Sequence, residues 1–156
     1  MGLSPAQAEF VERAGRYWEG SGHSRTAGRI LGWLMICEPR DQSSSALAAT
    51  LAVSAGSVST ITRQLLRMGL VDRVTYPGDR ASYFRLRGGV WLTVMDTALE
   101  EIRGLRALAE AGRDVLPATG VDRVEELWEM TGFMLEEWPR LMEQMAAEIG
   151  SRGART

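Results

Sequence analysis

The chain has 156 residues, 45% of them hydrophobic and 24% charged, which is enough apolar material for a domain with a buried core. No apolar run approaches the ~18 residues of a membrane span, and the first residues lack the charged start and apolar core of a signal peptide, so we expect a cytoplasmic protein. With one cysteine and one histidine, the chain has no internal disulfide, and we expect neither a metal site nor a cofactor.

The net charge of -2 hides an uneven distribution of charge along the chain. Between Arg25 and Arg87 there are nine arginines and four acidic residues, a net charge of +5. Between Asp96 and Glu148 there are five arginines and thirteen acidic residues, a net charge of -8. Because a basic segment attracts phosphate and an acidic one repels it, we expect any nucleic-acid contact in the first segment.

The first predicted element is a helix from about Ser4 to Glu19. Ser4 is a suitable N-cap, and Pro5 suits the first helical position because it has no N–H to satisfy. Helical spacing places four apolar or aromatic side chains on one face, which we expect to be buried: Phe10, Ala14, Tyr17 and Trp18.

A second helix is predicted from about Arg25 to Cys37, where Glu38-Pro39 ends it. Gly28 and Gly32 lie one turn apart in this helix, and we expect them to allow close approach of another helix. The apolar residues expected to face inward are Ala27, Ile30, Leu31 and Leu34.

The stretch LAATLAVSAGSVSTITRQLLRMGLVDR, from Leu47 to Arg73, predicts two short helices joined by a tight turn. The serines at 43–45 are candidate N-caps for the first helix, Ser54 is one for the second, and Gly69 stands where a left-handed C-cap residue is expected. The apolar residues predicted to pack the two helices together are Leu47, Leu51, Val53, Val58, Ile61, Leu65 and Leu66.

The opposite face of the second of these helices is polar and carries arginines. Such a face can enter a major groove, where base edges and phosphates accept hydrogen bonds. Ser57, Thr60, Arg63 and Gln64 are the candidates for base or phosphate contacts, and Ser59 and Arg67 for backbone contacts. With Ser54 and Arg80 they form the predicted DNA-binding set, and the leading hypothesis is sequence-specific binding to double-stranded DNA.

A β-hairpin is predicted next, with one strand from Leu70 to Tyr76, a turn at Pro77-Gly78-Asp79 and a returning strand from Ser82 to Leu86. The order helix, turn, helix, hairpin describes a winged helix-turn-helix. Arg80 lies near the tip of this wing, where it is a candidate for insertion into a minor groove, whose narrow geometry favours arginine. Arginines 73, 85 and 87 have two open roles: contacts to phosphate, or ion pairs with nearby acids such as Asp72.

Two long helical segments follow the wing. The first is predicted from Gly89 to about Gly112, and the second from Val121 to about Ile149, with a loop containing Pro117 and Gly120 between them. The apolar side chains expected to face inward from the first segment are Leu92, Met95, Leu99, Ile102, Leu105 and Leu108. The second has a heptad-like series that indicates oligomerisation: Val124, Leu127, Trp128, Thr131, Leu135, Trp138, Met142, Met145 and Ile149. Pro139 is expected to kink or break it, and residues 151–156 are expected to be disordered.

Aromatic residues around these helices are candidates for an effector cavity, where they would suit a cationic ligand through cation–π attraction. The candidates are Tyr17, Trp18, Trp33, Trp91 and Trp128, with Trp138, Met130 and Met134 as further members. The alternative is that they belong to the core or to a dimer interface, which is the commoner role of aromatics at helical spacing.

Catalysis is not expected from this sequence. It has no nucleophile elbow, no phosphate-cradling glycine loop and no zinc signature. His23 receives no role, and Cys37 is expected to be a small buried hydrophobic residue. The alternative to DNA binding is therefore another binding role, a winged-helix adaptor that contacts proteins and not DNA.

The segments HSRTAGRILGWLMICEP and LAATLAVSAGSVSTITRQLLRMGLVDR and the wing YPGDRASYFRLR together resemble MarR-type transcriptional regulators, especially their GbsR-like branch. The resemblance implies a homodimer with interlocked terminal helices, two winged heads on a pseudo-palindromic operator, and a small-molecule effector, which for this branch would be choline-like. The wing departs from the family pattern Asp, any residue, Arg, because Asp79-Arg80 is followed by Ala81.

The predicted fold is therefore mainly α with a small β-hairpin wing. We expect an N-terminal dimerisation helix in residues 1–24, a winged helix-turn-helix in 25–88 and C-terminal dimerisation helices in 89–150.

Overall fold

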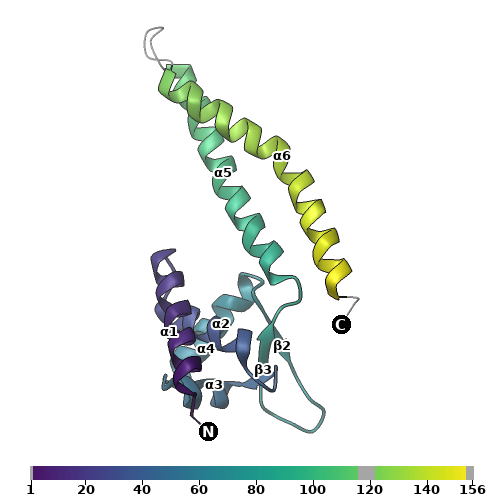
Figure 1. The fold of residues 1–156 in the computed structure, drawn as a ribbon. Coiled ribbons are helices and arrows are strands. Elements are labelled where there is room, and N and C mark those ends of the chain that lie inside the picture. The colour runs from purple at the N-terminus through teal and green to yellow at the C-terminus, as the bar shows by residue number, and fades with distance from the viewer. Residues whose placement is uncertain (1, 116–121, 154–156) are drawn as a thin grey trace. The chain divides into compact units, whose positions relative to one another are not determined.

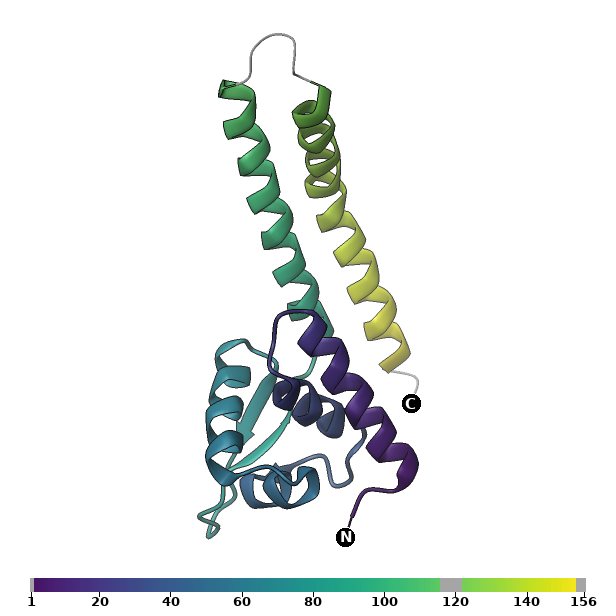
Figure 2. The ribbon, with the colours of Figure 1, turned by 90° about the vertical axis from the view of Figure 1, so that its left-hand side faces the viewer.

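The computed structural model describes residues 2–115 and 122–153, without the side chains of 122 and 151–153. The chain folds into two compact units, which we call the head (Met1–Val90) and the arm (Trp91–Thr156) (Figures 1 and 2). The elements are α1 (Pro5–Gly20), α2 (Arg25–Ile36), β1 (Gln42–Ser43), α3 (Ser44–Leu51), α4 (Ala55–Arg67), β2 (Val71–Val74), β3 (Tyr83–Leu86), α5 (Val90–Val115) and α6 (Asp122–Gly153). The predicted class, mainly helical with a small sheet, is confirmed.

The sheet contains one strand more than the predicted hairpin. Its order is β1-β3-β2, and both pairings are antiparallel. Gln42 pairs with Phe84 and Ser43 with Tyr83, so the connection between α2 and α3 is attached to the returning strand of the wing. A strand of two residues has no sequence periodicity, which is why the pattern did not indicate it.

Capping residues set the helix ends of the head, as the sequence predicts. The Ser4 side chain accepts a hydrogen bond from the Gln7 N–H, and the Gln7 side chain accepts one from the Ser4 N–H, which forms a capping box with Pro5 as the first helical residue. Ser43 caps α3, and Ser54 caps α4. Gly69 follows α4 with a φ of +71°, the left-handed conformation expected of it.

α1 and α2 pack against each other through glycines. A Cβ on Gly28 would lie 2.7 Å from the backbone oxygen of Ala14, and one on Gly32 would lie 2.6 Å from the Ala14 Cβ. The expected close approach at these two glycines is therefore confirmed.

The predicted inward face of α1 needs correction. The fully buried residues are Val11 and Gly15, whereas Tyr17 is 72% exposed and Phe10 is half-buried. The side of α1 that meets α2 is formed by Ala14, Gly15 and Trp18, so it overlaps the predicted face at Ala14 and Trp18 and leaves Tyr17 in solvent.

The helix-turn-helix buries four of its predicted apolar residues: Leu47, Leu51, Val58 and Leu65. Thr62 is buried in place of Ile61, which is half-buried like Val53 and Leu66. The Thr62 hydroxyl donates to the Val58 carbonyl at 2.8 Å, and this hydrogen bond lets a polar side chain occupy the apolar face.

The arm consists of α5 and α6, which run antiparallel in both views (Figures 1 and 2). α6 continues through Pro139, so the helix does not break at the proline. It ends at Gly153, so it includes the first residues of the tail that was expected to be disordered from residue 151. The most buried residue of α6 is Thr131. Leu105 and Leu108, which lie on α5 and were expected to face inward, are exposed. The predicted loop with Pro117 and Gly120, and residues 154–156, lie outside the described residues.

No single helix in the described part of the chain is both long and apolar enough to cross a membrane.

Replacing Gly28 or Gly32 with alanine is expected to lower the free energy of unfolding by about 1–3 kcal/mol, because the new methyl group overpacks the contact between α1 and α2. The control is Gly104→Ala, since a Cβ at this position in α5 meets no neighbouring atom within 4 Å. The control should be neutral or stabilising by up to about 1 kcal/mol, because alanine favours helix over glycine. Urea unfolding measures the free energy of unfolding of each variant. An equal change in this free energy for Gly28→Ala and Gly104→Ala would contradict the close packing of α1 and α2.

Candidate nucleic-acid interface

The outer face of α4 carries all of the predicted DNA-binding residues except Ser54, which precedes the helix, and Arg80, which lies on the wing. Ser57, Ser59, Thr60, Arg63 and Arg67 are exposed, and Gln64 is half-buried. The face points outward because the helix turns Val58, Thr62 and Leu65 into the head. The structure therefore presents the predicted residues together on one accessible surface.

The first turn of α4 is ordered by its own serines. The Ser54 side chain accepts a hydrogen bond from the Ser57 N–H at 3.1 Å, and the two hydroxyl oxygens lie 2.9 Å apart. These contacts satisfy one of the unpaired N–H groups at the helix start. Ser54 therefore has a structural role as a cap, besides any contact to DNA.

Arg63 is held along the surface of α4. Its Nε donates to the Ser59 carbonyl at 3.1 Å, one turn earlier in the helix. This bond leaves Nη1 and Nη2 as the nitrogens that would meet a phosphate or a guanine edge. The side chain is thus oriented before any ligand binds, which reduces the entropy that it loses on binding.

Asp79 orders the tip of the wing. Its Oδ1 accepts from the Ala81 N–H at 2.8 Å, and its Oδ2 accepts from the Tyr83 hydroxyl at 2.7 Å. The hydrogen bond from Ala81, followed by the one from Tyr83, holds the pKa of the Asp79 carboxyl below its usual range. Arg80, which is exposed, lies between Asp79 and Ala81, the two residues joined by the first of these hydrogen bonds.

The other wing arginines have partners within the head. Arg87 Nε lies 2.9 Å from Asp72 Oδ1, and Arg73 Nη2 donates to the Ser82 hydroxyl at 2.6 Å. For Arg87 this is the ion-pair alternative that the sequence left open. Exposed ion pairs contribute only about 0–1 kcal/mol, so a phosphate can replace the partner at little cost.

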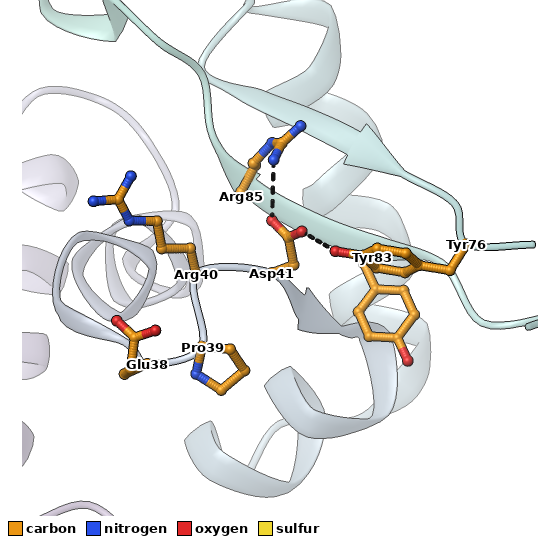
Figure 3. A pocket seen from close by; sticks show the side chains of 7 residues that line it. All are labelled: Glu38, Pro39, Arg40, Asp41, Tyr76, Tyr83 and Arg85. Atoms are coloured by element: carbon orange, nitrogen blue, oxygen red, sulfur yellow. Dashed lines mark hydrogen bonds and ion pairs between the residues drawn. The ribbon is translucent and has the colours of Figure 1, made fainter.

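A cleft of about 480 Å³ lies at the base of the wing (Figure 3). Its lining consists of Glu38, Pro39, Arg40, Asp41, Tyr76, Tyr83 and Arg85. The Tyr76 hydroxyl donates to Asp41 Oδ2, and Arg85 Nη1 lies 3.6 Å from Asp41 Oδ1. The hydrogen bond to Asp41 raises the pKa of Tyr76, and the one to Asp79 raises the pKa of Tyr83, so both hydroxyls remain protonated donors at neutral pH.

Sequence reasoning did not find Asp41 or the tyrosine pair. Asp41 lies in a polar connection without periodicity, and its partner Tyr76 is 35 residues away. The alternation of the hairpin strands places Tyr76 and Tyr83 in the wing, but it does not indicate what their hydroxyls contact.

The residues predicted to line an effector cavity are divided between the two units. In the head, Trp33 is buried with its Nε1 donating to Gln42 Oε1 at 3.2 Å, and the Trp18 ring lies 5.1 Å from that of His23. Trp33 is therefore part of the core of the head, which is the alternative role considered for these aromatics.

In the arm, Trp91 is 48% exposed, and Trp128 is covered by two guanidinium groups. Arg106 lies 3.8 Å and Arg113 4.2 Å from the centre of the Trp128 ring. These arginines already make the cation–π contact that a cationic ligand would need at this ring.

Cys37 is buried, as expected, and burial raises the pKa of its thiol, which disfavours the reactive thiolate. Within residues 2–115 and 122–153, no group of three or more His, Cys, Asp or Glu side chains is arranged to hold a metal ion.

Comparison with known proteins identifies the family. Residues 21–82 match the MarR family, and residues 89–148 match the MmpR5-like MarR family transcriptional regulators. The HTH-type transcriptional regulator MmpR5 of Mycobacterium tuberculosis is 40% identical over 130 residues, which are 83% of this chain and 79% of that protein. The crystal structure of a transcriptional regulator is similar with a TM-score of 0.74 and 34% identity, over 92% of this chain and 99% of that one.

The family-level resemblance seen in the sequence is thereby confirmed, whereas its GbsR-like branch has no support in these matches. The family consists of transcriptional regulators and not of enzymes. With a winged helix-turn-helix head that presents a polar, arginine-bearing helix, the chain belongs to the MarR family of DNA-binding transcriptional regulators.

Proposed function

We propose that this chain is a homodimer that binds a pseudo-palindromic operator in double-stranded DNA through α4 and the wing. The observation that carries the proposal is the exposed polar face of α4, which includes Arg63 and Arg67 and belongs to a segment with a net charge of +5. Two copies of α4 would lie about one turn of DNA apart, roughly 34–36 Å. Neither a protein-binding adaptor role nor any other second function is favoured by a specific feature of this surface.

Within this interface we assign different roles to different residues. Arg63, Thr60 and Gln64 are the candidates for base edges in the major groove. Ser59 and Arg67 are the candidates for contacts to the phosphate backbone, which set the position of the protein and not its sequence preference. Ser54 and Ser57 fix the first turn of α4, so they would orient the helix as well as contact the backbone.

Arg80 is the candidate for a minor-groove contact. It is exposed at the tip of the wing, and it follows Asp79, whose hydrogen bonds order that tip. A narrow minor groove concentrates negative potential and attracts an inserted arginine.

The apolar surface of the arm supports the homodimer. Large hydrophobic side chains on α5 and α6 are exposed: Leu105, Leu108, Val115, Met130, Phe133, Leu141, Met145 and Ile149. So many exposed apolar side chains are unusual for a monomer, and a second copy of the arm would cover them in a symmetric contact. Dimerisation would also provide the two heads that a palindromic site needs.

Modulation by a small-molecule effector is part of the proposal. A ligand changes operator affinity only if it binds the two states of the dimer with different affinity. The candidates for contacts to such a ligand are Tyr17 and Trp18 in the head and, separately, Trp91 in the arm. Trp128 is a weaker candidate for a cationic effector, because Arg106 and Arg113 already cover its ring.

Replacing Arg63 with alanine is expected to weaken binding to a duplex from upstream of the protein's own gene by about 5- to 100-fold, corresponding to the loss of one direct contact. If Arg63 binds phosphate, the slope of log affinity against log salt should also fall by about one. The control is Arg103→Ala in the arm, where Arg103 pairs with Glu100. Fluorescence anisotropy at several salt concentrations measures both. Wild-type protein without salt-dependent binding, or equal affinity for the two variants, would refute the proposed interface.

Replacing Phe133 with glutamate is expected to raise the dimer dissociation constant at least about tenfold, because it places a charge in a buried apolar contact. Phe133 is 67% exposed within one chain, so the change should leave the fold of the arm intact. Glu126→Gln, an exposed change on the same helix, is the control. Sedimentation equilibrium distinguishes the outcomes, and a dimer equally stable in both variants would exclude Phe133 from the interface.

A further inference from the structure

The wing is too small to fix its own orientation. β2 and β3 have four residues each, and the segment from Thr75 to Arg80 is exposed throughout. A two-stranded hairpin of this size is only marginally stable by itself, and the third strand, β1, pairs with β3 through only two residues. The position of Arg80 therefore depends on the contacts that tie the wing to the rest of the head.

One such contact comes from outside the hairpin. Asp41, in the connection between α2 and α3, accepts a hydrogen bond from the hydroxyl of Tyr76, which lies two residues after β2. Its other oxygen lies 3.6 Å from Arg85 Nη1 on β3 (Figure 3). A single carboxylate thus contacts both β3 and the loop that follows β2, and its own side chain is only 15% exposed.

A chain of contacts continues from Tyr76 to the wing tip. The Tyr76 and Tyr83 rings meet edge to face, with centroids 5.1 Å apart at an interplanar angle of 84°. The Tyr83 hydroxyl donates to Asp79, and Asp79 accepts from the Ala81 N–H beside Arg80. We call the side chains of Asp41, Tyr76, Tyr83 and Asp79 the wing clasp.

Three polar side chains of the cleft contact one another: Asp41, Tyr76 and Arg85. The lining of the cleft has two arginines and two acids, and so no net charge that would favour an anionic or a cationic ligand. Both carboxylate oxygens of Asp41 face groups of the wing. The arrangement fits a mechanical tie between two segments of the head better than a site for a small molecule.

We propose that Asp41 is a positioning residue for DNA binding, which acts through the wing clasp to hold Arg80 where it meets DNA. This inference rests on the proposed contact between Arg80 and the minor groove. Asp41 itself does not touch DNA in this account. Its removal should therefore loosen the wing, and its effect on DNA binding should depend on the presence of Arg80.

The experiment uses the full chain and two variants that open the clasp in different ways. Asp41→Ala removes the carboxylate, and Tyr76→Phe removes only the hydroxyl while it keeps the ring against Tyr83. Asp96→Ala is the matched control, because it removes an exposed carboxylate from α5. Each variant is made alone and together with Arg80→Ala.

Brief trypsin digestion with mass spectrometry measures the looseness of the wing directly. Both clasp variants should speed cleavage after Arg80 by at least about threefold, because proteolysis follows local opening. Cleavage after Arg63, inside α4, should stay at the wild-type rate. If the rates after Arg63 and Arg80 rise together, Asp41 stabilises the whole head and the positioning role is refuted.

Affinity for the duplex from upstream of the protein's own gene provides the second readout. Asp41→Ala and Tyr76→Phe should each weaken binding by about 3- to 30-fold, but by less than about twofold when Arg80 is already alanine, since coupled residues are not additive. Equal losses in both backgrounds would overturn the proposal, as would unchanged affinity in both variants. Failure of the proposed function itself looks different: the wild type then shows no salt-dependent binding, or Arg63→Ala has no effect.

Discussion

The burial of apolar side chains where α2, α3 and α4 meet is the constraint on which the head depends. Ile30, Leu47 and Leu65, one from each helix, are at most 1% exposed. A helix of 13 residues that turns such side chains inward must turn the residues at intermediate positions outward, because successive side chains differ by about 100° around its axis. The exposed position of Thr60 and Arg63 is thus a consequence of core packing.

Electrostatics then determines which partner this outer face suits. The basic residues are concentrated in the segment that forms the helix-turn-helix and the wing, whereas the segment that forms most of the arm has a net charge of -8. Phosphate is therefore attracted to the head and repelled by the arm. The exposed apolar side chains of the arm suit a second copy of the same chain, so that one segment would bind DNA and the other would pair the heads.

Much of the head could be predicted from sequence because local chemistry marks its boundaries. Ser4, Ser54 and Gly69 stand where a cap or a left-handed residue is required, and all three have that conformation. Features that depend on contacts distant in sequence were missed: β1, the inward face of α1 and the tie between Asp41 and Tyr76. The candidate interface follows the same division, because helical periodicity indicates which residues of α4 are exposed but not which of them contact DNA.

Hydroxyl-radical footprinting of the region upstream of the protein's own gene tests the central claim most directly, because it reports both DNA contact and symmetry. We expect two protected half-sites that are related by approximate two-fold symmetry. Their centres should be about 10 base pairs apart, because two copies of α4 would occupy successive major grooves. Protection should disappear in the Arg63→Ala variant and persist in the Arg103→Ala control. A single unpaired protected site, or no protection at concentrations where the protein is a dimer, would contradict this claim.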